Sequence, residues 1–244
     1  MRTMQITNIS DRQRPQPAFA ADFSFGQFCR AAILLGPEDA EKMGFGMTRS
    51  ERVIKRTFDI VVSVAALIVL SPLFLVIALG IRLSSPGPVI FTQERIGRHG
   101  RPFTILKFRT MCCDAPAVFY DDGQTKVDKN DSRVFPFGRL LRYGLDELPQ
   151  LVNVLRGEMS LIGPRPDEPC HIKHYRTGWF RKLDIRPGIT GLPQVYGRRE
   201  LPWPDRVALD VAYTRGYRLK IDFAIFLRTA GAIIFDKTSS DQGL

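Results

Sequence analysis

The chain has 244 residues, of which 44% are hydrophobic and 25% are charged, and its formal net charge is +10. This length is enough for one sizeable domain, and the excess of positive charge favours anionic partners, that is, phosphates, nucleic acid or an anionic lipid surface. The four cysteines form no CxxC pair, which argues against the disulfide framework of a short secreted protein.

The N-terminal part of the sequence lacks the features of a signal peptide. Residues 1–22 include several polar and charged side chains and no apolar core, whereas a signal peptide requires one. We expect residues 1–50 to form a variable, poorly ordered extension.

One long apolar segment follows this extension. From Ile60 to Ile81 no residue is charged, and a continuous helix over this segment would be roughly 33 Å long at about 1.5 Å per residue. On length alone an ordinary transmembrane helix is the simpler interpretation, because the hydrocarbon core is about 30 Å thick. However, Ser71-Pro72 interrupts the segment, and proline removes an N–H donor and disfavours a helical residue before it. The sequence therefore also fits a bent hairpin whose halves, each of about 16 Å, enter one leaflet and return.

Basic residues flank the apolar segment on both sides. They precede it from Arg49 to Arg56 and follow it from Arg82 to Arg109. Because positive residues mark the cytoplasmic side of a membrane, we expect both ends of the segment on that side. Many transmembrane helices tolerate a central proline, so a single crossing stays open as the alternative.

The rest of the chain mixes strand and helix patterns. Val89 to Gln93 and Phe103 to Phe108 are β-prone and are separated by a basic tip with two glycines, which predicts a β-hairpin. Apolar residues at helical spacing before Gly157 predict a helix over 146–156. The segment from Leu219 to Phe235 is apolar but is cut by an aspartate and an arginine, which favours a helix that lies along a membrane surface.

Asp146-Glu147 stands at the start of the predicted helix over 146–156. An N-cap aspartate followed by a glutamate is common in helices of any function, because both suit the positive end of the helix dipole. The same field would keep Asp146 ionised, and an ionised aspartate can attack phosphorus. Mg²⁺ prefers one or two carboxylates together with substrate phosphate oxygens, so Glu147, together with Asp146, is the candidate magnesium site.

Basic and glycine-containing segments supply candidates for phosphate binding. In Gly163-Pro164-Arg165-Pro166 a rigid turn presents one arginine, which suits bidentate phosphate recognition, although a solvated surface turn has the same pattern. Loop 186–191 has glycines that suit close approach of the backbone to a ligand, or an ordinary structural role. The other candidates are Lys107, Arg109, Arg139 and Arg142, together with Gly188 and Gln194 in and after that loop.

Several of these motifs occur together and in a known order. They are KRTFDI (Lys55 to Ile60) with the apolar segment and Ser71-Pro72, the hairpin region from Ser85 to Met111, LDELPQLVNVLRGEMSLIGPRP (Leu145 to Pro166) and RPGITG (Arg186 to Gly191). On these residues the chain resembles the bacterial sugar transferase family, the monotopic phosphoglycosyl transferases that initiate glycan assembly, over roughly residues 51–237.

The resemblance implies a fold and a location. The fold would be α+β and mainly helical, in a monotopic protein of the bacterial inner membrane with a small β-hairpin and interfacial amphipathic helices. A re-entrant helix–break–helix would cover residues 51–83, a catalytic domain facing the cytoplasm would cover 84–237, and a tail would follow at 238–244.

The resemblance also implies roles for three residues. The family's nucleophile is the aspartate of the dyad, here Asp146, and its partner, here Glu147, is tied to Mg²⁺. The arginine of the Pro-Arg-Pro loop, here Arg165, is associated with phosphate binding. In two places the sequence departs from the family: Arg142 lies one residue closer to the nucleophile than the usual arginine, and Pro193 replaces a common tryptophan.

The implied reaction is a ping-pong transfer. The aspartate attacks the sugar-bearing phosphate of a UDP-sugar and expels UMP, and a polyprenyl phosphate, expected to be undecaprenyl phosphate, then takes the hexose 1-phosphate. This step would initiate an exopolysaccharide or another surface glycan. The other expected partners are membrane lipid and downstream glycosyltransferases, and a homodimer stays open.

Three other classes of protein compete with this interpretation. A non-enzymatic basic membrane scaffold would not need the dyad, and a conventional glycosyltransferase would move only the sugar and release UDP. A nucleic-acid-binding protein is not expected, because the sequence has no helix-turn-helix, zinc or RNA-recognition motif. The sequence names neither the sugar nor the final polymer.

Overall fold

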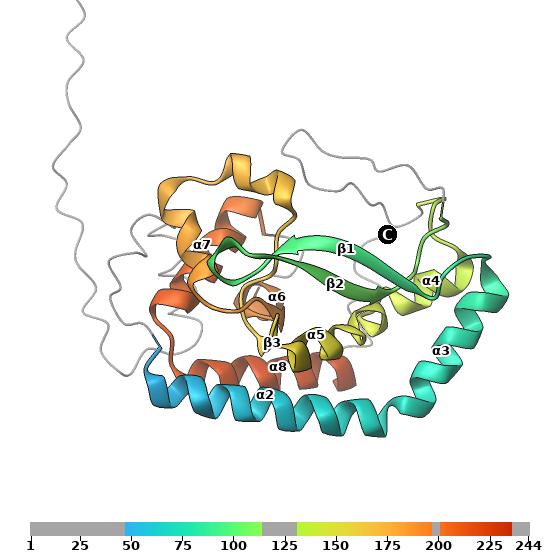
Figure 1. Cartoon of the computed structure of the whole chain (residues 1–244), viewed down its shortest axis with the longest axis horizontal. Helices are drawn as coiled ribbons and strands as arrows, with labels where there is room; N and C mark the ends of the chain where they lie inside the picture. The colour runs from blue at the N-terminus through green and yellow to red at the C-terminus, as the bar shows by residue number, and fades with distance from the viewer. Residues whose placement is uncertain (1–46, 114–130, 197–200, 236–244) are drawn as a thin grey trace, which may run out of the picture.

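The structure, a computed structural model, describes residues 47–113, 131–196 and 201–235, and describes side chains as far as residue 231. Most of the expected N-terminal extension (1–46) and the expected tail (238–244) lie outside the described residues. In Figure 1 two helices, α2 and α3, form a long bent base, and the β-hairpin lies across the middle of the molecule above it. A mainly helical fold with a small antiparallel hairpin is therefore confirmed.

The apolar segment folds as two helices with a sharp bend. Helix α2 (Arg49–Val69) begins at a capping box and α3 (Ser71–Ser84) continues it at an angle of 62°. Pro72 lies in the first turn of α3, where its missing N–H breaks no helical bond. The predicted break is confirmed, with helix ends one or two residues outside 51–83. In the described part of the chain no single helix has the length and hydropathy of a membrane crossing, and this pair has them only when taken together.

Helix α2 has the reverse of the usual burial pattern. Its buried side chains are polar, namely Lys55, Asp59 and Ser63, which share one face because they are spaced four residues apart. Most of the exposed positions are apolar, and they include Val53, Ile54, Phe58, Val61, Val64, Ile68 and Val69. A helix surrounded by water would bury such apolar residues.

The predicted β-hairpin is confirmed. Strands β1 (Ile90–Ile96) and β2 (Pro102–Phe108) pair antiparallel and are joined through the short helix η2 (Arg98–Gly100). Gly100 has a φ of +74°, in the left-handed region that glycine adopts without strain. Lys107 lies near the end of the second strand of this hairpin.

The predicted helix over 146–156 is wrong in its first turn. The chain instead forms α4 (Pro136–Leu141), a single 3₁₀ turn η3 (Leu145–Glu147), and then α5 (Gln150–Arg156). Pro149 is the cause, because it lacks a helical N–H and disfavours a continuous α-helix through the residue before it. Asp146 therefore lies inside a 3₁₀ turn and is not the N-cap of a longer helix.

The C-terminal half surrounds a short parallel strand pair, β3 (Ser160–Ile162) and β4 (Gly188–Thr190). The other elements are η4 (Pro169–His174), η5 (Thr177–Asp184), α6 (Leu192–Tyr196), α7 (Trp203–Arg215) and α8 (Leu219–Phe235). Helix α8 lies beside α2 (Figure 1) and is tied to it by an ion pair of 2.7 Å between Lys55 and Asp222. Asp222, the aspartate that interrupts the apolar sequence of α8, is therefore buried against α2.

Candidate active site

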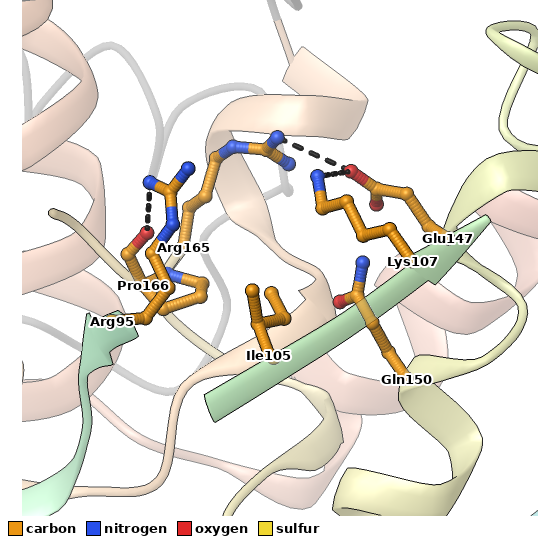
Figure 2. Close-up of a pocket in the computed structure, with 8 residues that line it drawn as sticks. Arg95, Ile105, Lys107, Glu147, Gln150, Arg165 and Pro166 are labelled. Atoms are coloured by element: carbon orange, nitrogen blue, oxygen red, sulfur yellow. Dashed lines mark hydrogen bonds and ion pairs between the residues drawn. The ribbon is translucent and has the colours of Figure 1, made fainter. Parts of the chain in front are cut away.

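A pocket forms where β2, the dyad turn η3, α5 and the loop after β3 meet. It is lined by Arg95, Ile105, Lys107, Glu147, Gln150, Arg165, Pro166 and Gly188. Figure 2 shows the long side chains of Lys107 and Arg165 reaching from two different segments toward the carboxylate of Glu147. Three predicted site residues that are distant in the sequence are therefore brought together.

Glu147 is the centre of this group. Its Oε1 atom accepts hydrogen bonds from Lys107 Nζ at 3.0 Å and from Arg165 Nη2 at 3.2 Å. Burial alone would raise the pKa of Glu147, but the charges of Arg165 and Lys107 and their hydrogen bonds outweigh burial and lower it to about 2. Glu147 is therefore a carboxylate at neutral pH. We call Lys107, Glu147 and Arg165 the pocket cluster.

Asp146 has a different electrostatic environment from its neighbour. Burial raises the pKa of Asp146, the charge of Lys107 opposes this most strongly, and the adjacent Glu147 raises it further. The expectation that a helix dipole keeps Asp146 ionised is wrong, because the residue sits in a single 3₁₀ turn. The influences that lower the pKa of Asp146 are the charge of Lys107, then a hydrogen bond with its own backbone N–H, and then the charge of Arg142.

The strand that carries Lys107 is fastened to the helix that follows the dyad. Asn153 on α5 accepts from the backbone N–H of Leu106 at 3.0 Å and donates to the carbonyl of Thr104 at 2.7 Å. Asn153 is fully buried, so these bonds are shielded from water. They hold β2, and with it the backbone of Lys107, in a fixed position relative to α5 and the dyad that precedes it.

The loop that carries Arg165 is held by the contact between β3 and β4. The N–H of Gly188 donates to the carbonyl of Pro164 at 2.9 Å. A Cβ atom on Gly188 would lie 2.1 Å from the backbone nitrogen of Gly163, so only glycine fits there. Gly188 lines the pocket as predicted, but the close approach that requires a glycine is to the backbone directly after β3 and not to a ligand.

The other predicted site residues lie away from the pocket lining. Arg109 is buried and donates to the carbonyls of Pro88 at 2.6 Å and Ser85 at 2.8 Å, so its guanidinium fastens a turn within the fold. Arg139 is exposed on α4. The amide of Gln194 is buried and has no partner among the described residues.

The dyad suits a magnesium ion that is shared with a phosphate. Across the described ranges no group of three or more His, Cys, Asp or Glu side chains could hold a metal ion. Asp146 and Glu147 supply two neighbouring carboxylates, and two carboxylates plus substrate phosphate oxygens are a donor set that Mg²⁺ accepts. The residues therefore fit this ion when the substrate supplies the remaining ligands.

A second charged group includes a residue of the same loop, and it was not predicted from the sequence. Lys182 Nζ contacts Asp167 Oδ2 at 2.7 Å and Asp210 Oδ2 at 3.2 Å. We call these three residues the inner cluster. The signal for it was Asp210 itself, a lone charge between Val207 and Ala212 in an apolar run of α7, because a charge in such a position needs a buried partner.

The sequence model of the bacterial sugar transferase family matches residues 50–236. The chain belongs to this family. The family predicted from the ordered motifs is thereby confirmed, and the protein is a transferase.

Three members of the family have informative names. The chain is 37% identical over 199 residues to the exopolysaccharide production protein ExoY of Sinorhizobium fredii, covering 77% of this chain and 88% of that protein. It is 42% identical over 192 residues to the UDP-glucose:undecaprenyl-phosphate glucose-1-phosphate transferase of Caulobacter vibrioides, covering 74% and 69%. It is 39% identical over 198 residues to the undecaprenyl-phosphate galactose phosphotransferase of Salmonella typhimurium, covering 76% of this chain and 41% of that longer protein.

Proposed function

We propose that this protein transfers a hexose 1-phosphate from a UDP-sugar to undecaprenyl phosphate. The names of the Caulobacter and Salmonella relatives support the reaction, and the name of the Sinorhizobium relative supports a role in exopolysaccharide production. The observation that carries the proposal is the convergence of Lys107 and Arg165 on Glu147, the neighbour of Asp146, whose pKa is influenced by the charges of both Lys107 and Glu147.

In the first half of the proposed reaction, a carboxylate oxygen of Asp146 attacks the phosphorus that bears the sugar. The bond between this phosphorus and the bridging oxygen breaks, and UMP leaves with the electron pair. Lys107 and Arg165 stabilise the negative charge that spreads over the phosphoryl oxygens. Glu147 and Asp146 would hold Mg²⁺, which when bound supplies further positive charge to the diphosphate.

In the second half, an oxygen of undecaprenyl phosphate attacks the same phosphorus. The acyl phosphate bond to Asp146 breaks, the aspartate returns as a carboxylate, and the product is a lipid diphosphate that carries the sugar. A covalent intermediate divides one difficult transfer into two easier steps. It also allows the soluble nucleotide to depart before the lipid reacts.

The bent helix pair is proposed to be the membrane anchor. Apolar side chains cover the outer face of α2, and Leu75, Val76, Leu79 and Leu83 are exposed on α3. This arrangement suits a re-entrant hairpin in the inner membrane with the catalytic domain on the cytoplasmic side. Cysteines introduced before Ile60 and after Ile81 should react with a membrane-impermeant label from the same side. Reaction from opposite sides would establish a single crossing instead.

The reaction is tested by nucleotide release from the purified full chain with a panel of UDP-sugars, Mg²⁺ and undecaprenyl phosphate. We expect UMP release from wild type and a loss of at least about 10³-fold in Asp146→Asn, because the nucleophile is gone. Asp184→Asn is the matched control, since Asp184 is 44% exposed and lies outside the pocket lining; it should keep full activity.

The rival functions give different results in the same assay. Release of UDP would assign the protein to sugar-only transfer. If folded wild-type protein releases no nucleotide from any of the UDP-sugars, the membrane scaffold is favoured.

A further inference from the structure

Gln150 is a pocket residue to which the proposed mechanism gives no role. It is the first residue of α5, it is 2% exposed, and it lines the pocket with Lys107, Glu147 and Arg165. Its Nε2 atom is buried and has no hydrogen-bond partner among the described residues. Figure 2 shows the side chain extending from α5 toward the ends of Lys107 and Glu147.

An amide N–H₂ group in such a place lacks an acceptor within the fold. Buried polar groups in native proteins are nearly always hydrogen-bonded, because an unsatisfied donor loses its bonds to water without replacement. Lys107 and Arg165 carry only donors. Glu147, the one carboxylate that lines the pocket, accepts from both of these cations through Oε1, and Gln150 Nε2 donates to neither of its oxygens. A ligand bound in the pocket would supply the missing acceptor.

The chemistry of the pocket identifies that acceptor. Three cationic side chains, those of Arg95, Lys107 and Arg165, line the same pocket, so the ligand group is an anion. The oxygens of a phosphate accept hydrogen bonds from charged and neutral donors alike. A neutral amide also has a specific advantage beside Glu147. It donates to the phosphate without adding a third cation that this carboxylate would bind.

We infer that Gln150 donates its amide N–H to a non-bridging oxygen of the phosphoryl group that is transferred. This inference rests on the proposed function. The same phosphorus occupies the site in both half-reactions, so Gln150 contacts it during attack by Asp146 and again during attack by the lipid phosphate. Gln150 is thus a substrate-binding residue whose contact also persists in the covalent intermediate.

The test replaces Gln150→Met, which preserves length and removes both polar atoms. We expect kcat/KM for UMP release to fall about 10- to 100-fold, because one preorganised donor to the phosphoryl group is lost. The midpoint of thermal unfolding should stay the same or rise, because a buried donor without a partner has been removed from the fold. A purely structural glutamine would show the opposite, namely a lower unfolding midpoint.

A second measurement separates this inference from the proposed reaction. Binding of UDP-glucose is measured by calorimetry in Asp146→Asn and in Asp146→Asn/Gln150→Met, neither of which can turn over. We expect the dissociation constant to rise about 10-fold in the double variant. If wild type releases no UMP, the proposed function fails, while the binding comparison still decides the role of Gln150.

Two outcomes overturn the inference. One is equal activity, or equal binding of UDP-glucose, with and without the Gln150 amide. The other is a lowered unfolding midpoint in Gln150→Met, which would show that the amide has a partner within the fold. Gln150→Glu sharpens the result, since it replaces the donor with a carboxylate that repels phosphate and should reduce activity at least as much as methionine does.

Discussion

Two charged groups lie on the two sides of one short loop, and their compositions are opposite. In the pocket cluster, Lys107 and Arg165 share a single carboxylate oxygen of Glu147, and the Arg165 side chain is 49% exposed. In the inner cluster, one ammonium group contacts two carboxylates, and its side chain is 3% exposed. Only Pro166 separates Arg165 of the first group from Asp167 of the second.

The difference shows what each group is built to do. The pocket cluster has a surplus of positive charge that faces solvent, which suits an arriving diphosphate. The inner cluster has no such surplus and finds its partners within the fold, for example the hydroxyl of Tyr175, which donates to Asp167. A change in the pocket cluster should therefore affect catalysis first, whereas a change in the inner cluster should affect stability first.

The largest expected effect comes from Lys182→Met in the inner cluster. The substitution leaves two buried carboxylates without their shared cation, and breaking a buried pair in this way costs about 3–5 kcal/mol of unfolding free energy. Chemical denaturation in detergent would measure this loss. Arg181→Ala is the matched control, because Arg181 is the next residue and pairs with Asp184 at 3.9 Å on the surface, where little stability is expected to be lost. Equal losses in the two variants would contradict the distinction between the clusters.

A smaller effect on stability, dependent on pH, is expected from Asp210→Asn. Burial raises the pKa of Asp210 from 3.8 to about 6, although Lys182 lowers it. Because the folded protein binds this proton more tightly than the unfolded chain, the stability from protonation is complete below pH 3.8 and is lost as pH rises through about 6. Asparagine has no such loss. As pH rises from 3.8 to about 6, the unfolding free energy of the variant should therefore increase by about 2–3 kcal/mol relative to that of wild type.

Unfolding free energies of wild type and Asp210→Asn, measured at several pH values, check this sign. A difference between the two proteins that does not change with pH would show that Asp210 keeps its ordinary pKa in the fold. If the variant becomes less stable relative to wild type as pH rises, the ion pair with Lys182 outweighs the cost of burial.

The local elements could be predicted from the sequence because their causes are local. The hairpin follows from two β-prone runs around glycines, and the bend at Leu70 follows from Pro72. The helix through the dyad was mispredicted because apolar periodicity was given more weight than Pro149, although a proline at that position predicts the break. The membrane anchor and its topology stay predictions.

The site was only partly predictable, for a physical reason. Asp146, Glu147 and Arg165 stand in recognisable motifs, but the sharing of one Glu147 oxygen by Lys107 and Arg165 depends on how β2, η3 and the β3 loop pack. Such long-range pairing leaves no local pattern. The same holds for Gln150, whose burial beside the pocket is set by the break at Pro149 and not by any periodicity.

The smallest expected effect is a shift in a pH profile, produced by Lys107→Met in the pocket cluster. Lys107 is the strongest opponent of the burial that raises the pKa of Asp146, so its loss should raise that pKa further. The nucleophile is then ionised only at higher pH, and the acidic limb of the pH profile of kcat/KM for UMP release shifts to higher pH. Lys107→Arg retains the charge and should leave the limb closer to its wild-type position.

This shift separates the two clusters independently of any loss in maximum rate. Asp210→Asn should change the pH dependence of stability and leave the acidic limb of catalysis in place, whereas Lys107→Met should do the reverse. A limb that stays fixed in Lys107→Met would mean that another cation, such as Arg142, keeps Asp146 ionised. The pocket cluster would then serve to bind phosphate and not to prepare the nucleophile.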